Sequence, residues 1–139
     1  MTHTIFTKRI AAGLVAATIS TATLVTPAAA GGSISFNFAP RTADEANALR
    51  TGLAIYGLIK GAKNGGNISQ NGTNNSAGLQ QYGQGNFGVV HQDGRGHNGT
   101  VQQYGGYNSY GLFQFGKNTN GHVTQQGYRG TGATFQFGW

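Results

Sequence analysis

The chain has 139 residues, of which nine are lysine or arginine, three are aspartate or glutamate, 25 are glycine and none is cysteine. This composition excludes the disulfide framework that stabilises many small secreted domains, and it is poor in the leucine, isoleucine and valine of an ordinary core. The cations stand singly along the chain rather than in a cluster, which argues against a nucleic-acid-binding surface.

Residues 1–30 have the pattern of a secretory signal peptide. Lys8 and Arg9 form a short basic segment, Ile10 to Val25 is mostly apolar, and the residues up to Ala30 offer an Ala-x-Ala cleavage site. The apolar run contains serine and threonine and is shorter than the roughly 20 residues that a membrane-spanning helix needs. We therefore expect cleavage after Ala30, secretion of a mature chain of residues 31–139, and no stable membrane insertion.

A short strand is expected near the start of the mature chain. The stretch SISFNF, from Ser33 to Phe38, alternates in character and so places Ile34 and its two phenylalanines on one side of an extended strand. Pro40 ends this strand.

The residues from Ala43 to about Lys60 have the pattern of a helix. Thr42 and Glu45 fit a capping box, with Thr42 as the N-cap and Glu45 reaching back to it. Gly52 and Gly57 are expected to weaken the helix by up to about 1 kcal/mol each. The apolar residues that follow the cap recur at helical spacing and form one face: Ala46, Leu49, Leu53 and Tyr56.

Two roles are open for this N-terminal strand and helix segment, residues 31–63. It could cover the edge of the first coil of the region that follows, or it could be a targeting element that the secretion machinery reads. The apolar helix face favours the cap, because such a face needs a surface to bury.

The sequence from residue 64 to 139 repeats every eleven residues without an insertion. Each unit contains a glutamine that is followed two positions later by a glycine. The glutamines are Gln70, Gln81, Gln92, Gln103, Gln114, Gln125 and Gln136, and the glycines are Gly72, Gly83, Gly94, Gly105, Gly116, Gly127 and Gly138.

Other positions of the unit also repeat. An apolar residue stands two positions before the glutamine in six units, and an asparagine stands six positions before it in several. These residues are Ile68, Leu79, Val90, Val101, Leu112 and Val123, and Asn75, Asn86 and Asn108. Because the glutamine and the apolar residue are two positions apart, they lie on one face of a strand of about six residues. The glycines and asparagines predict a tight turn after it, since both accept positive φ.

This pattern predicts an all-β fold, and a short β-solenoid explains it better than an antiparallel meander. In a solenoid two units form one coil, and units 22 residues apart stack in two facing, parallel, in-register sheets about 4.8 Å apart. Glutamines in one column can then hydrogen-bond to each other. Such a ladder removes the cost of about 1–3 kcal/mol that an unpaired buried polar group carries. A meander gives no reason for the units to be so alike.

The pattern Ala77-x-Leu79-x-Gln81-x-Gly83-x-Gly85-Asn86-x-Gly88-x-Val90-x-Gln92 resembles the curlin repeat of curli subunits. It recurs from residue 99 to 114 and more loosely from 121 to 138, so the resemblance covers residues 64–139. It implies a subunit secreted across both membranes that polymerises into adhesive extracellular amyloid fibres of a bacterial biofilm. It also implies two partners besides the chain itself, an outer-membrane secretion channel and a surface nucleator.

The last unit, Gly132 to Trp139, is aromatic and uncharged, and we expect it to leave a bare strand edge that templates the next subunit. Catalysis is not expected, because His91, His97 and His122 have no paired acid or nucleophile in the pattern. Neither a metal nor a cofactor is expected. The competing hypothesis is a monomeric secreted solenoid that binds a ligand or glycan through an outer aromatic ladder, formed by Tyr82 and Tyr104 on one sheet or by Phe113, Phe135, Phe115 and Phe137 on the other.

Overall fold

A computed structural model describes residues 31–62 and 65–139 of the chain. The predicted signal peptide and Asn64 lie outside these residues. The described part contains one helix, α1 (Ala43–Ile59), and eight strands. The strands are β1 (Ser33–Phe38), β2 (Gly66–Thr73), β3 (Ser76–Tyr82), β4 (Phe87–Arg95), β5 (Asn98–Gly106), β6 (Ser109–Lys117), β7 (Asn120–Tyr128) and β8 (Thr131–Gly138).

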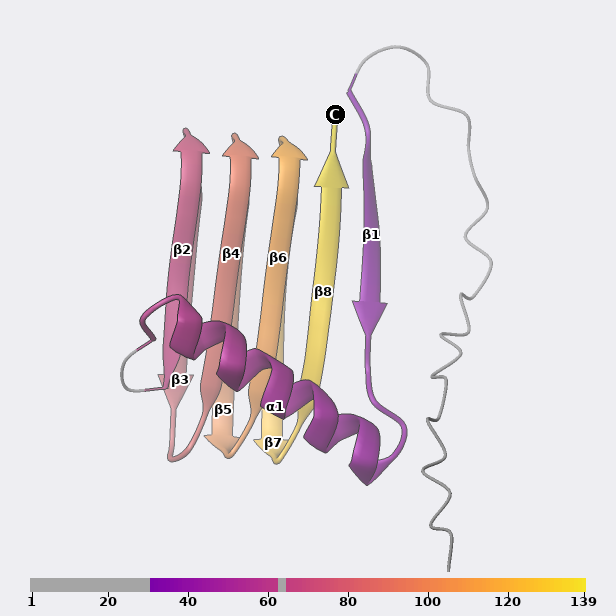
Figure 1. Ribbon diagram of the computed structural model, residues 1–139, viewed down its shortest axis with the longest axis vertical. Helices are drawn as coiled ribbons and strands as arrows, with labels where there is room; N and C mark the ends of the chain where they lie inside the picture. Colours follow the sequence, from indigo (N-terminus) through magenta and orange to yellow (C-terminus); the bar gives the residue numbers. More distant parts are fainter. Residues whose placement is uncertain (1–30, 63–64) are drawn as a thin grey trace, which may run out of the picture.

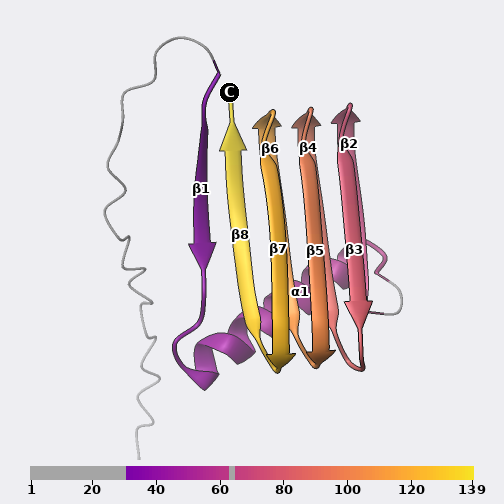
Figure 2. The same cartoon turned by 180° about the vertical axis from the view of Figure 1, so that it is seen from behind.

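The repeat region is a β-solenoid, as its period predicts. Strands β2, β4, β6 and β8 stack in one sheet and β3, β5 and β7 in a second, and the two sheets face each other (Figures 1 and 2). Every pair of repeat strands is parallel, and the register places each residue beside the one 22 positions on, for example Gln92 beside Gln114. The solenoid therefore has three complete coils and the first strand of a fourth.

The strands are seven to nine residues long rather than about six. In the nine-residue strands β4 to β7 most of the difference arises at the carboxyl end. In β5, for example, Gly105 still lies in the strand, so the connection to β6 is shorter than the repeat pattern indicated.

The narrow interior between the two sheets is apolar at one level of each coil. Val90, Val101 and Leu112 are fully buried there, and Leu79 and Val123 pack against them at the two ends of the stack. Glycines such as Gly88 and Gly99 let the sheets approach, because a Cβ at either position would come within 2.4 Å of a side chain from the opposite sheet. The buried aliphatic residues and these glycines thus lie on the same inward face of each strand.

Strand β1 is an additional member of the larger sheet, and its position corrects the sequence-based expectation. It pairs antiparallel with β8, from Ser33 opposite Gly138 to Phe38 opposite Ala133, so it covers the last coil and not the first. The bare edge that we expected at the last unit is therefore covered in this sheet. The phenylalanines of β1 lie on the same side as those of β8, and Phe36 meets Phe137 edge to face at 6.4 Å.

The helix lies across the outer face of the five-stranded sheet rather than over the edge of the first coil (Figure 1). Leu53 is buried against Val89 and Phe113, with Leu49 and Tyr56 beside it. The predicted N-cap is confirmed, since the Thr42 hydroxyl accepts from the Glu45 N–H at 3.2 Å. The Glu45 carboxylate accepts from the N–H of Arg41, one residue before the position that a capping box predicts.

Gly57 is the glycine of α1 that the packing explains. It is buried, and a Cβ at this position would come within 2.5 Å of the Phe87 ring. The conformational cost of glycine in the helix is thus accompanied by closer contact between helix and sheet.

Candidate functional site

Two ladders of glutamine amides run through the interior of the solenoid. Gln70, Gln92, Gln114 and Gln136 form the ladder of the larger sheet, and Gln81, Gln103 and Gln125 form that of the smaller one. The amides of neighbouring rungs are joined by hydrogen bonds of 2.8–2.9 Å. The three central side chains, Gln92, Gln103 and Gln114, are fully buried.

The glutamine ladders have a direction. In all five rung-to-rung bonds the Nε2 of one glutamine donates to the Oε1 of the glutamine 22 residues later. In Gln92, Gln103, Gln114 and Gln136 the second N–H of the amide donates to a backbone carbonyl of the opposite sheet, as Gln103 does to Phe87 at 3.1 Å. Each of the three central amides therefore accepts from the preceding rung and donates to the following one. Both the Nε2 and the Oε1 atoms of these amides are hydrogen-bonded.

The corners between strands are held by asparagines in two columns, Asn75 in one and Asn86 and Asn108 in the other. Asn86 donates to the carbonyls of Tyr82 and Gly105, at 3.2 and 3.0 Å, and its Oδ1 accepts the backbone N–H of Asn108 in the next coil. Asn75 and Asn108 make the corresponding bonds. Each asparagine thus connects two coils through main-chain groups that a turn would otherwise leave unsatisfied.

His97 takes the asparagine position in one corner and was not identified as structural from the sequence. Its side chain is 1 % exposed. Nδ1 lies 2.8 Å from the Thr119 hydroxyl and 3.4 Å from the Thr119 backbone N–H, and Nε2 lies 3.3 Å from the Asp93 carbonyl. An imidazole protonated on Nε2 alone satisfies these partners, because a carbonyl needs a donor and a backbone N–H needs an acceptor. The sequence signal was the column itself, since His97 lies 22 residues after Asn75.

The glycines of the Gln-x-Gly motif are required by the stacking. Six of them, Gly72 to Gly127, have positive φ between 87° and 134°. A Cβ at Gly83 or Gly105 would lie 2.0 Å from the carbonyl oxygen of the glycine in the next coil. Gly127 has no atom within 4 Å of such a Cβ, because no strand follows β7 in its sheet. Gly138 is not among the positive-φ glycines, but its Cβ would lie 1.8 Å from the Lys117 carbonyl.

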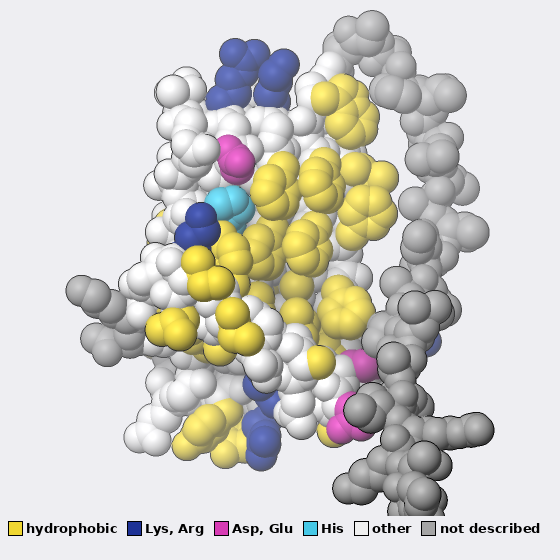
Figure 3. Space-filling model, in the orientation of Figure 1, with side chains coloured by type: hydrophobic (Ala, Val, Ile, Leu, Met, Phe, Trp, Pro, Cys, Tyr) yellow, Lys and Arg dark blue, Asp and Glu magenta, His cyan; other side chains and the backbone are white. Residues whose placement is uncertain are grey.

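Aromatic side chains form ladders on both outer faces. Tyr82 and Tyr104 stack on the smaller sheet, with ring centroids 5.0 Å apart and planes inclined by 1°. On the larger sheet Phe113 stacks on Phe135 at 4.9 Å, and Phe115 on Phe137 at 5.2 Å. These last rings continue onto β1, and Figure 3 shows the resulting apolar area beside α1.

The two ends of the solenoid differ. At the first coil, β2 and β3 are outermost in their sheets, and the inward-facing Ile68 remains 43 % exposed. At the other end the larger sheet extends through β8 to β1, whereas the smaller sheet stops at β7. In the described residues, three repeat strands therefore have a free edge: β2, β3 and β7.

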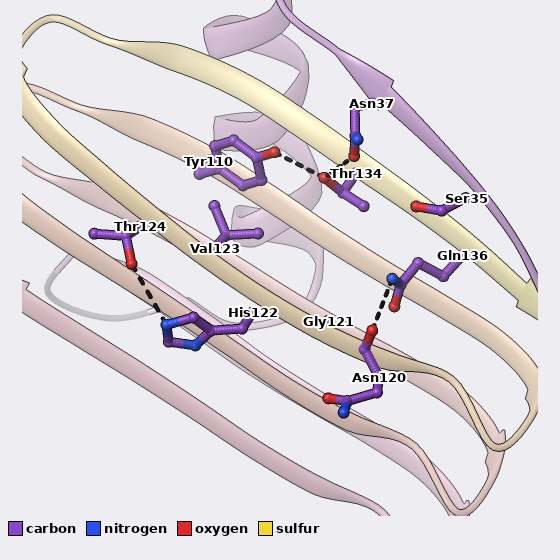
Figure 4. Close-up of a pocket in the computed structure, with 10 residues that line it drawn as sticks. All are labelled: Ser35, Asn37, Tyr110, Asn120, Gly121, His122, Val123, Thr124, Thr134 and Gln136. Carbon is purple, nitrogen blue, oxygen red and sulfur yellow. Dashed lines mark hydrogen bonds between the residues drawn. The ribbon is translucent and has the colours of Figure 1, made fainter.

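The unequal ends of the sheets leave a cleft of about 420 Å³, which we call the step. It is lined by Ser35 and Asn37 of β1, Thr134 and Gln136 of β8, Tyr110 of β6 and residues 120–124 of β7 (Figure 4). Within it the Thr134 hydroxyl donates to the Asn37 side-chain oxygen at 2.7 Å and lies 2.7 Å from the Tyr110 hydroxyl oxygen. The Gln136 amide donates to the Asn120 carbonyl at 3.0 Å. The step occupies the place where another strand of the smaller sheet would lie.

Tyr56 of α1 and His91 of β4, which lie together where the helix covers the larger sheet, have shifted pKa values. Burial lowers the pKa of His91, and the positive charge of Lys60 adds to this, while Asp93 acts in the opposite direction. Burial also raises the pKa of the Tyr56 hydroxyl. The Tyr56 ring meets the His91 ring edge to face, with the two ring centroids 5.8 Å apart. Among the described residues no group of three metal-ligating side chains is present.

We expect His91 to make the stability of the fold depend on pH. The lowered pKa means that the folded chain binds the proton less well than the unfolded chain, whose histidine titrates near 6.5. The stability that neutral His91 contributes is fully present above pH 6.5. It is lost as the pH falls from 6.5 toward the pKa of His91 in the folded chain. Urea unfolding between pH 7.5 and 5.5 should show a smaller loss of stability for His91→Phe, which extends the Phe113 column, than for the parent chain. Equal slopes would contradict this assignment.

Within the described residues, no helix combines the length and the apolar content needed to cross a bilayer. Comparisons with protein-family models, with curated proteins and with solved structures found no match for this chain.

Proposed function

We propose that the chain is a non-enzymatic structural subunit that is secreted and assembles with copies of itself into extracellular fibres. The observation that supports this most directly is the in-register stack of near-identical rungs, in which the amide ladder of the smaller sheet continues from coil to coil and ends at an open strand edge on each side. A further copy can extend both the backbone hydrogen bonds and the amide bonds without a new kind of contact. Extracellular adhesion and a biofilm matrix role follow from the curlin resemblance, as do a secretion channel and a nucleator as partners.

The free edges supply the driving force for this assembly. A row of unpaired N–H and C=O groups on β2, β3 or β7 is a template for another strand, and proteins that remain monomeric protect such edges with charge or proline. The sequences of β2, β3 and β7 contain neither lysine, arginine nor proline. Covering the half-exposed Ile68 and the amide of Gln70 at the first coil adds apolar burial to the hydrogen bonds.

The test uses residues 31–139, the mature chain expected after removal of the signal peptide. At a concentration of tens of micromolar we expect thioflavin fluorescence that rises with time, loss of the monomer peak on a sizing column, and a reflection near 4.8 Å along the axis of aligned fibres. A chain that keeps its monomer peak after seeding and prolonged incubation would contradict the proposal.

A second candidate function is favoured by the outer aromatic ladders. Phe36, Phe135 and Phe137 are each more than one third exposed and lie together on one face (Figure 3). Such a face could bind a planar or glycan ligand as a monomer. A stable monomer whose tyrosine or phenylalanine substitutions abolish binding to a glycan array would favour this function over assembly.

A further inference from the structure

We propose that the β7–β8 end of the solenoid accepts the first coil of a second copy turned by half a turn about the solenoid axis, and that β1 must first leave β8. In this joint β7 pairs with β2 of the incoming copy, and β8 pairs with its β3. The proposal rests on the self-assembly proposed above and specifies its geometry.

The half turn follows from the number of repeat strands. Seven units alternate between the two sheets, so the chain starts and ends in the same sheet. The next free position after β8 lies in the smaller sheet, beside β7. An incoming β2 must fill that position to continue the alternation, although β2 belongs to the larger sheet of its own molecule. The larger sheet of one copy therefore continues as the smaller sheet of the next.

The step has the position and the lining that this joint needs. It is bounded by β7, β8 and β1, and it is a cleft of about 420 Å³ that opens at the end of the smaller sheet. Gly127, at the end of β7, has open space where every earlier glycine of its column meets a carbonyl of the next coil. The strand that fills the step supplies that carbonyl, from Gly72 of the incoming copy.

The amide ladders are complementary at the two ends. Among the described residues, Gln125 Nε2 donates to no partner, and Gln136 Nε2 donates only to the Asn120 carbonyl. At the first coil the Oε1 atoms of Gln70 and Gln81 accept no hydrogen bond from the described residues. The half-turn register places Gln125 beside Gln70 of the incoming copy and Gln136 beside its Gln81. Donors therefore face acceptors in both sheets.

Strand β1 occupies the position that the incoming β3 requires. The connection from β2 to β3 contains only Asn74 and Asn75, so a copy that places β2 in the step has to place β3 directly beside β8. That edge is held by six residue pairs to β1. The inward side chains of β1 are Ser35 and Asn37, which lack the glutamine and the aliphatic residue of a repeat strand. Strand β1 thus covers the edge of β8 but adds no rung to the glutamine ladder or to the apolar stack. Its release therefore leaves the interior contacts of the repeat strands intact.

A reversible disulfide between β1 and β8 tests the cover. Gly32 and Trp139 exchange both backbone hydrogen bonds, so Asn37 and Thr134, five positions along, form a non-hydrogen-bonded pair with closely spaced side chains. The chain has no cysteine of its own. We expect the oxidised Asn37→Cys/Thr134→Cys variant to elongate at least ten-fold more slowly than the same protein after reduction. Equal rates in the two states would overturn the role of β1.

Cysteine pairs across the joint test the half turn. The proposed register places Thr124 of β7 beside Ser69 of the incoming β2, whereas an unrotated copy would place Gln80 of β3 there. In mixed assemblies of single-cysteine variants, Thr124→Cys should form a disulfide-linked dimer with Ser69→Cys and not with Gln80→Cys. The reverse result would overturn the half turn. If the parent chain forms no fibres in the same buffer, the proposed function itself fails, which separates that outcome from a failure of the joint.

The glycine column offers an independent test at β7. In Gly127→Ala the new methyl group meets nothing within the chain but faces the carbonyl of the incoming strand. Gly61→Ala is the matched control, since Gly61 also has positive φ and open space but lies after the helix. Both variants should keep the parent's circular dichroism spectrum, and only Gly127→Ala should lose elongation, by at least ten-fold. Elongation of folded Gly127→Ala at the control's rate would overturn the proposal.

Discussion

Replacing Gly105 by alanine is expected to unfold the repeat region, with a loss of at least about 4 kcal/mol in the free energy of unfolding. The backbone at this position has a φ of 105°, which a residue with a side chain rarely adopts. The new Cβ would also lie 2.0 Å from the Gly127 carbonyl oxygen, well inside contact distance. Relief of this contact has to separate β5 from β7, and that separation breaks the ladder of backbone hydrogen bonds.

Gly127→Ala separates the two causes. Its φ of 110° nearly equals that of Gly105, but no atom lies within 4 Å of the added Cβ. The variant therefore keeps the backbone strain, of about 1–3 kcal/mol, without the contact. Urea unfolding followed by circular dichroism at low protein concentration should show a much larger loss for Gly105→Ala than for Gly127→Ala. Equal losses would mean that φ alone, and not the stacking of coils, accounts for the glycines.

The interior of the solenoid could be predicted from the sequence because each contact is repeated. A residue such as Gln103 has the same neighbours as Gln81 and Gln125, so one period of eleven determines the side, the sheet and the register of every repeat strand. The stacked rings of Tyr82 and Tyr104 follow from the same rule. The pattern also identified the columns of asparagines at the corners, although not that a histidine could satisfy the same main-chain groups.

The placement of the N-terminal segment could not be predicted, because its contacts occur once. Alternation in SISFNF indicates a strand, but it does not distinguish an edge about 100 residues away from the nearby edge of β2. The choice depends on phenylalanines of β8, such as Phe137, that match those of β1 on the outer face. Similarly, the apolar helix face around Leu53 predicted a cap over the first coil, whereas the structure packs it against Val89 and Phe113 on the outer face of the sheet. That outer face becomes visible only once the strands are stacked into one broad sheet.

The second change with a large expected effect is the loss of one amide from the inner glutamine ladder. Gln103→Leu should cost about 3–5 kcal/mol of stability and should also slow fibre growth. The amide of Gln103 accepts from Gln81 at 2.8 Å and donates to Gln125 at 2.9 Å and to the Phe87 carbonyl at 3.1 Å. Leucine has a similar volume but leaves these three partners unpaired in a buried site, at about 1–3 kcal/mol for each group that water cannot reach. Gln114→Leu should behave alike, since it breaks the corresponding bonds of the other ladder.

Gln102→Leu is the matched control for this change. Gln102 is the neighbouring residue and also belongs to a glutamine pair, with a bond of 2.8 Å to Gln80, but that pair lies on the solvent side of the sheet. Water replaces the lost bond there, so the expected loss is below about 1 kcal/mol and the growth rate should stay near that of the parent. Unfolding curves and seeded thioflavin kinetics measure the two effects. Equal losses for Gln102→Leu and Gln103→Leu would rule out the inner ladder as the cause.

Replacing the whole column tests whether the amides act as a ladder or as separate fillers. In Gln81→Leu/Gln103→Leu/Gln125→Leu the amide-to-amide partners are removed together, so only the backbone carbonyls of Gly65 and Phe87 lose a donor. The triple variant should then lose clearly less than three times the loss of Gln103→Leu, because the single change leaves amides unpaired on both sides of the leucine. Additive losses would mean that each glutamine contributes alone. A shortfall of several kcal/mol would show that the unit of stability is the column, which is the property that lets a ladder continue from one copy into the next.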